Sequence, residues 1–295
     1  MLKWALFALF VIPVASADEL SLHLFRSPLG INWKTPWSLA TSTLLNQVAP
    51  VGDKRAFSIS HVFVEVKCDS TGEHIYRGMT SVTTTEERDL LFRQKYGLGI
   101  MFHTYKGLYE KDQAILDDMA PYEGSKRKAI LTYKISASTC ERLIRYAHEY
   151  EQLGYGNMYS GLQADPLKRE GAGCSAFAVS FLRVGGLMSG FEQEWQQTLA
   201  VPKRLVGGPL TGSEVRLSRI IARPGIRWNK SEPHIPLVAW DPELMHQWVQ
   251  KMYWETLSSE VVSEDTPQLE RVGDTLQVIF DLSDRETPNG DFWIR

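Results

Sequence analysis

The chain has 295 residues, of which 43% are hydrophobic and 23% are charged, a composition typical of a globular protein. The formal net charge is −3, and it becomes about −4 if the first 17 residues, which include Lys3, are removed. This balance supplies no basic excess that would attract nucleic acid or an anionic membrane, so we expect no polyanion as a partner.

The first residues predict a cleavable signal peptide over residues 1–17. A lysine precedes an apolar run from residue 4 to residue 14, and the triplet ASA at positions 15 to 17 is the small-residue pattern after which signal peptidase cuts. We therefore expect a mature protein that begins at Asp18 and is periplasmic or secreted. No later stretch holds about 18 uninterrupted apolar residues, so we expect no transmembrane segment in the mature chain.

The segments up to residue 135 predict an irregular start followed by strands. Residues 18–54 contain three prolines among short apolar pieces. We interpret them as an irregular N-terminal arm that carries no catalytic or binding residue. Residues 58–67 alternate with a period of two and, with a turn at 69–72, predict a β-hairpin whose second strand is 74–80. Two further apolar runs, 98–103 and 129–135, have strand length.

The later segments predict helices and one last strand. Cys140, Leu143, Ile144 and Ala147 recur at helical spacing in a helix that Ser136 or Ser138 caps and that ends near Gly154. Further elements expected here are a helix over 174–183, a helix over 242–256 and a strand over 275–282. We expect an α+β fold, with a catalytic domain over 55–190 and a C-terminal extension over 191–295 packed on it.

The three cysteines are an odd set for an oxidising compartment, where thiols tend to pair. Cys140 lies on the apolar stripe of its helix, and Cys68 ends a strand; a bridge between them is one alternative and burial of both is the other. No C-x-x-C spacing is present, so a structural zinc site is not expected. With either alternative, we expect Cys174 to be a free thiol.

Cys174 stands where a thiol is activated. It follows the segment GAG and begins a predicted helix, whose free amide groups stabilise a thiolate and an oxyanion. A small core cysteine is the alternative, but the glycine loop and the helix start favour a nucleophile. A thiolate of this kind needs a base, and His61, which opens a strand with an apolar stripe, is the histidine held on the most rigid element.

The order of these parts resembles a known family. The piece SHVFVEV around His61, followed by a hairpin, further strands, a helix and then GAGCSAFAVSFL around Cys174, is similar to the circularly permuted papain-like hydrolases of the NlpC type. The resemblance covers roughly residues 55 to 190. It implies an antiparallel sheet packed against the cysteine helix, with Cys174 as nucleophile, His61 as base and no metal or organic cofactor.

The family also places an orienting residue on the strand after the histidine. His74 has close to the family's spacing, whereas closing the hairpin at 69–72 brings Thr80, and not His74, opposite His61. We therefore take His74 first and Thr80 as the geometric alternative. Loop residues Tyr155, Asn157 and Tyr159 either line the site, where they could serve an oxyanion, or pack the loop, which is the more common role.

These observations predict an exported cysteine hydrolase that cleaves an amide or ester through an acyl-enzyme. The expected substrate is a cell-wall peptide, with a lipid-acyl ester or amide as the alternative. The rival function is a non-catalytic binding or assembly module on the same fold, in which Cys174 belongs to the core.

Overall fold

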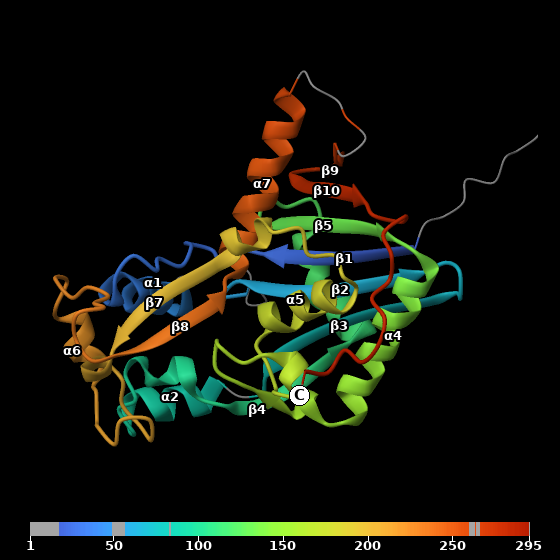
Figure 1. Cartoon of the computed structure of the whole chain (residues 1–295). Coiled ribbons are helices and arrows are strands. Elements are labelled where there is room, and N and C mark those ends of the chain that lie inside the picture. The colour runs from blue at the N-terminus through green and yellow to red at the C-terminus, as the bar shows by residue number, and fades with distance from the viewer. Residues whose placement is uncertain (1–17, 49–56, 83, 260–262, 264–265, 295) are drawn as a thin grey trace, which may run out of the picture.

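The protein, seen here as a computed structural model that describes residues 18–48, 57–82, 84–259, 263 and 266–294, is an α+β structure built on one large mixed sheet (Figure 1). The expected signal peptide, residues 1–17, lies outside the described residues. Among the residues that are described, none of the helices is both long and apolar enough to cross a membrane.

The main sheet has eight strands in the order β6-β4-β3-β2-β1-β5-β10-β9. Neighbouring strands run antiparallel except β5 and β10, which are parallel. The strands are β1 (Asp18–Phe25), β2 (His61–Cys68), β3 (Glu73–Ser81), β4 (Tyr105–Lys111), β5 (Lys128–Ile135), β6 (Met158–Tyr159), β9 (Gln268–Val272) and β10 (Thr275–Asp281).

Three helices share the main hydrophobic core on one face of this sheet: α4 (Ala137–Gln152), α5 (Cys174–Val184) and α7 (Pro242–Ser258). The alternation along β2 explains this, because Val62, Val64 and Val66 all enter that core. The opposite face carries Phe63, which packs in a smaller cluster with Ile115 of α3 (Asp112–Met119). The two faces of β2 therefore serve different cores.

A second region lies beside the main sheet and has a core of its own. Strands β7 (Gln196–Pro202) and β8 (His234–Trp240) form a separate antiparallel pair. They share that core with α1 (Pro36–Val48), α6 (Leu217–Ile221) and the 3₁₀ helix η1 (Leu98–Phe102). Helix α2 (Thr84–Phe92) precedes η1 on the same side of the molecule (Figure 1).

Several predicted elements are confirmed. The hairpin of β2 and β3, strand β5, helices α4, α5 and α7, and strand β10 all occur within a few residues of their expected bounds. The Ser136 side chain caps α4 by accepting a hydrogen bond from the Thr139 amide, and Asp241 caps α7 in the same way through the Glu243 amide.

The prediction of an irregular arm over 18–54 is wrong. Residues 18–25 form β1, which lies in the middle of the main sheet between β2 and β5. Leu20, Leu22 and Leu24 are fully buried, and this period of two was present in the sequence. The prolines that suggested an irregular segment all lie after the strand, and Pro36 begins α1.

One other expectation also changes. Residues 98–102, expected as a strand, form the 3₁₀ helix η1, in which Gly99 packs so closely on Gly207 that an added Cβ would lie 2.2 Å from the Gly207 carbonyl oxygen.

The segment after residue 190, expected as an extension packed on the first part of the chain, shares its sheet and core. Strand β10 pairs with β5, and α7 shares the main core with α4 and α5.

Candidate active site

Cys174 is the first residue of α5, and Gly173 before it has an extended backbone at φ −70° and ψ 165°. The residues that follow, SAFAVSFLRV, are almost all buried, so tertiary packing and not intrinsic helix propensity stabilises this helix. An added Cβ on Gly171 would lie 2.3 Å from the main-chain oxygen of Met158. Gly171 therefore allows the chain's own strand β6 to approach.

His61 begins β2, and its ring lies in an aromatic setting. The ring stacks on Phe57 at a centroid distance of 5.0 Å and meets the edge of Phe63 at 4.4 Å. Only 7% of His61 is exposed to solvent, and only 5% of Cys174. A side-chain hydrogen bond joins His61 and Cys174. The two predicted site residues therefore lie together in a nearly closed place, where charges interact strongly.

The two groups set each other's ionisation. Burial alone would raise the pKa of the Cys174 thiol, but the charge of His61 and a hydrogen bond from the Val62 amide outweigh it and lower the pKa. Burial alone would lower the pKa of His61, but Cys174, with a smaller contribution from Glu110, raises it to about 10. The two shifts therefore both favour a thiolate paired with an imidazolium.

Glu110 on β4 is a third member of the site that the sequence did not reveal. Its Oε2 atom lies 3.5 Å from Nε2 of His61, and its side chain is 11% exposed. Neither of these two atoms has another hydrogen-bond partner among the described residues, so each interacts mainly with the other. The separation is long for a hydrogen bond and corresponds to an ion pair in a buried setting.

Gly78 explains how Glu110 reaches His61 across β3. Glu110 pairs with Gly78, and a Cβ added to Gly78 would lie 2.6 Å from the Phe63 ring and 3.0 Å from the Glu110 carboxylate. Only a residue without a side chain leaves this passage open. No pattern in the segment YKGLYEK distinguishes Glu110 from the other acidic residues, so sequence reasoning had no signal for it.

The structure does not bring His74 to Cys174. His74 pairs with Lys67, six residues along β2 from His61, which corresponds to about 20 Å of strand. Its ring nitrogen Nε2 lies 2.7 Å from Glu65, and its side chain is 44% exposed. The expected role of His74 is corrected on this ground. The alternative, Thr80, pairs with Leu108 on β4, and the pairs between β2 and β3 end at Val64 and Arg77, before either His61 or Thr80. The carboxylate paired with His61 is that of Glu110.

Of the three loop residues considered, only Tyr159 joins the site. Its hydroxyl forms hydrogen bonds with the side chain and the main-chain N–H of Cys174. Burial, followed by the negative charge of Cys174, holds the pKa of Tyr159 well above its usual value, so it remains a donor. Tyr155 packs on Tyr150 and Trp293, and Asn157 is exposed at the end of a 3₁₀ turn.

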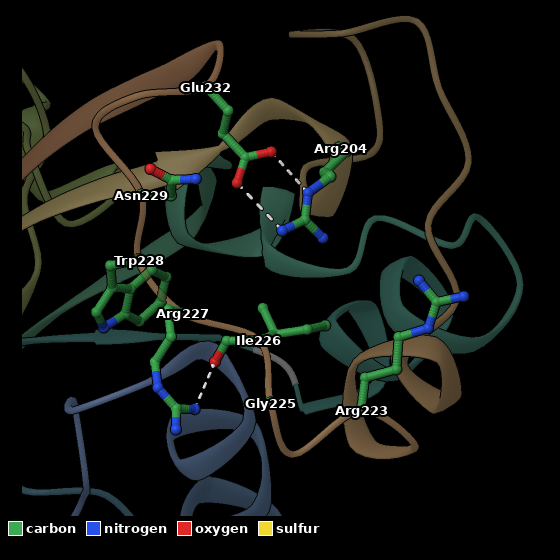
Figure 2. A pocket seen from close by; sticks show the side chains of 8 residues that line it. All are labelled: Arg204, Arg223, Gly225, Ile226, Arg227, Trp228, Asn229 and Glu232. Carbon is green, nitrogen blue, oxygen red and sulfur yellow. Dashed lines mark hydrogen bonds and ion pairs between the residues drawn. The ribbon is translucent and has the colours of Figure 1, made fainter.

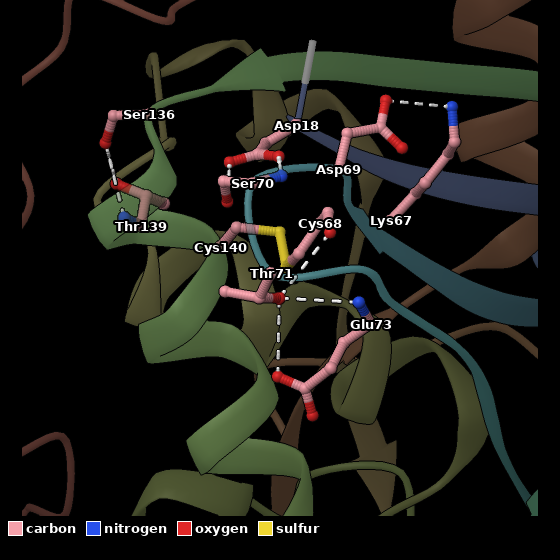
Figure 3. Close-up of a disulfide and its surroundings, with 10 residues drawn as sticks. All are labelled: Asp18, Lys67, Cys68, Asp69, Ser70, Thr71, Glu73, Ser136, Thr139 and Cys140. Carbon is pink, nitrogen blue, oxygen red and sulfur yellow. Dashed lines mark hydrogen bonds and ion pairs between the residues drawn. A yellow bond between two sulfur atoms is a disulfide. The ribbon is translucent and has the colours of Figure 1, made fainter. Parts of the chain in front are cut away.

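The other two cysteines form a disulfide, which leaves Cys174 as the free thiol. The bridge joins the end of β2 to α4, with Cα atoms 5.8 Å apart, and the Asp18 carboxylate binds Ser70 beside it (Figure 3). It anchors the strand whose other end carries His61. Cys68 and Cys140 are therefore bridged, and are not two buried free thiols.

No group of three or more histidine, cysteine, aspartate or glutamate side chains among the described residues could hold a metal ion. Comparison with known proteins adds no relative. No family model matches the chain, and it has no match among curated proteins or solved structures.

Proposed function

We propose that the protein is an exported thiol hydrolase that cleaves an amide or ester through an acyl-enzyme on Cys174. The observation that carries the proposal is the buried pair of Cys174 and His61 at a helix N-terminus, with Glu110 behind the imidazole. Nucleophile, base and a charged group that orients the base are the three parts such a reaction needs. A buried pair in which each group shifts the pKa of the other is typical of a functional site.

The reaction follows from the positions of these groups. The Cys174 thiolate forms a bond to the substrate's carbonyl carbon, and the carbonyl electrons move to its oxygen. That oxyanion accepts hydrogen bonds from the Cys174 amide and from the Tyr159 hydroxyl, which already lie together. When the intermediate collapses, the C–N or C–O bond breaks and His61 gives its proton to the leaving atom.

Deacylation uses the same groups in reverse. Neutral His61 takes a proton from a water molecule, whose oxygen attacks the thioester carbon. Collapse of this second intermediate releases the carboxylic acid and restores the thiolate, with the proton kept on His61. Glu110 favours the imidazolium at both stages because its charge lies 3.5 Å away.

The substrate class is proposed from the expected compartment and from the shape of the site. Cys174 and His61 are almost covered, so a slender and flexible segment suits the site better than a folded protein surface. A cell-wall peptide and a lipid-acyl chain both meet this condition. The expected signal peptide favours the cell-wall peptide.

One observation favours the rival function, a binding or assembly module. A cysteine that is only 5% exposed also resembles a small core residue. The two functions differ in thiol chemistry, because a core thiol is inert, whereas a thiolate paired with an imidazolium reacts with a small alkylating reagent near neutral pH. The bridge leaves no other thiol to compete for the reagent.

The test combines activity with thiol labelling. Wild type, Cys174→Ala and His61→Ala are assayed on a panel of peptidoglycan peptides and a panel of acyl esters and amides, and iodoacetamide labelling is mapped by peptide. The proposal expects both variants to lose the same activity and remain folded, because nucleophile and base act as one unit. Full turnover by Cys174→Ala on a substrate that wild type cleaves would refute it.

A further inference from the structure

A strongly basic surface lies on the second region, although the whole chain has a net charge of −3. Residues 203–232 carry seven basic side chains and only two acidic ones. All seven are exposed, and five are arginines. We call this set the basic surface: Lys203, Arg204, Arg216, Arg219, Arg223, Arg227 and Lys230.

The acidic residues of the segment leave most of these cations free. Glu232 holds Arg204 through two hydrogen bonds of 2.7 and 3.1 Å, and Glu214 holds Lys95 from a neighbouring segment. In the part of the chain that the structure describes, no ion pair is made by the other four arginines: Arg216, Arg219, Arg223 and Arg227. Exposed cations that make no ion pair are available to an outside anion.

The basic surface contains two adjoining hollows that share Arg223. Figure 2 shows the larger, of about 620 Å³, with Arg223 and Arg227 on either side of Gly225 and with the ring of Trp228 beside Arg227. The second, of about 520 Å³, is lined by Lys95, Arg216 and Arg219 as well as Arg223. Arg227 uses one nitrogen, Nη1, to donate to main-chain oxygens, and this fixes its position at the rim.

We propose that the basic surface docks the protein onto a membrane that contains anionic phospholipids, with lipid phosphates bound around Arg223, which both hollows share. Arginine binds phosphate through two parallel hydrogen bonds, and clustered lysine and arginine side chains are attracted to anionic phospholipid headgroups. The expected export favours this partner over nucleic acid, because a membrane is the phosphate-rich surface that an exported protein meets.

The position of the basic surface suits this role. Helix α6 lies at one end of the molecule, away from α4, α7 and the main sheet (Figure 1). A membrane that contacts this end leaves the main sheet uncovered. The proposal does not depend on the proposed hydrolase activity, because binding is measured without a substrate.

The test measures co-sedimentation with vesicles, using the protein that begins at Asp18 so that the apolar leader contributes nothing. Vesicles of phosphatidylcholine alone are compared with vesicles that also contain phosphatidylglycerol, at low and at physiological salt. The variant is Arg216→Gln, Arg219→Gln and Arg223→Gln combined. The control combines Arg145→Gln, Lys251→Gln and Arg271→Gln, which removes the same charge from α4, α7 and β9.

We expect wild type and control to bind the anionic vesicles and the Arg216, Arg219 and Arg223 variant to bind at least tenfold more weakly, with binding reduced by salt. Matching thermal unfolding of all three proteins excludes misfolding. Equal loss in the control, equal binding to neutral vesicles or no binding by wild type would overturn the proposal. So would tighter binding to duplex DNA, loss of vesicle binding in a few millimolar inorganic phosphate, or salt-sensitive self-association without vesicles.

Discussion

Glu110 lies 3.5 Å from His61 although a whole strand, β3, separates their two strands. Gly78 makes this possible, because it leaves the face of β3 between them without a side chain. The arrangement differs from the expected one, in which the orienting group stands on the strand directly after the histidine. The charged group that completes the site therefore comes from two strands away.

The first prediction concerns this carboxylate. Glu110→Gln keeps the shape and removes the charge, so the imidazolium is less favoured and kcat should fall by about 10- to 100-fold. Unfolding in denaturant should change little, because no other hydrogen bond of the Glu110 Oε2 atom is lost. His74→Gln is the matched control, and it should leave kcat unchanged because its partner is Glu65 at the other end of the hairpin. A larger loss in His74→Gln than in Glu110→Gln would reverse the assignment.

The second prediction concerns pH. The lowered pKa of Cys174 means that its alkylation should persist to lower pH than that of a thiol with the ordinary pKa of 9.0, which slows tenfold for each unit below that value. His61→Ala should restore that ordinary slope. The measurement is the rate of iodoacetamide modification between pH 5 and 10, and a wild-type slope equal to that of the variant would contradict the ion pair.

The same pKa shifts predict how stability depends on pH. The raised pKa of His61 contributes stability that is complete below 6.5 and is lost as the pH rises through about 10. The lowered pKa of Cys174 contributes stability that is present above 9.0 and is lost as the pH falls through its folded value. Cys174→Ala should remove both trends, which thermal unfolding across this range will show.

The third prediction concerns Tyr159. Tyr159→Phe removes the hydroxyl that contacts Cys174, so an oxyanion loses one donor and kcat should fall by about 10²- to 10³-fold. Tyr155→Phe makes the same chemical change in the same loop, where the ring packs on Tyr150 and Trp293, and should cost little. Comparable kcat values for the two variants would show that Tyr159 only packs the loop.

The sequence predicted the elements that carry a regular pattern. The alternation along β2, the apolar stripe of α4 and the glycine-flanked start of α5 were each visible, and they place His61 and Cys174 correctly on their elements. Spacing alone could not show which strands become neighbours. Glu110 was missed because its role depends on β4 pairing with β3 at Gly78, which is a long-range contact.

The basic surface was missed for a related reason. Net charge sums over the whole chain, so the acidic residues elsewhere concealed an excess of five positive charges, the difference between seven and two, within residues 203–232. Residues 18–25 form a strand although three prolines follow them, because the alternation of Leu20, Leu22 and Leu24 places all three side chains in the core.

The last prediction concerns the second half of the chain. A truncation that ends at Gly190 loses β10, which pairs with β5, and α7, whose buried Met245, Trp248 and Val249 cover the main core. The exposed edge of β5 and the uncovered apolar surface should make this protein aggregate. Size-exclusion chromatography and thermal unfolding are the measurements, with a shorter truncation after Asp291 as control.

The control protein loses Trp293, which packs on Tyr146 and Tyr155, so it should be destabilised. It should nevertheless remain a monomer, because the sheet and α7 are intact. If the protein ending at Gly190 were monomeric and unfolded cooperatively, the C-terminal half would be an independent unit, and the shared core would not be needed for folding.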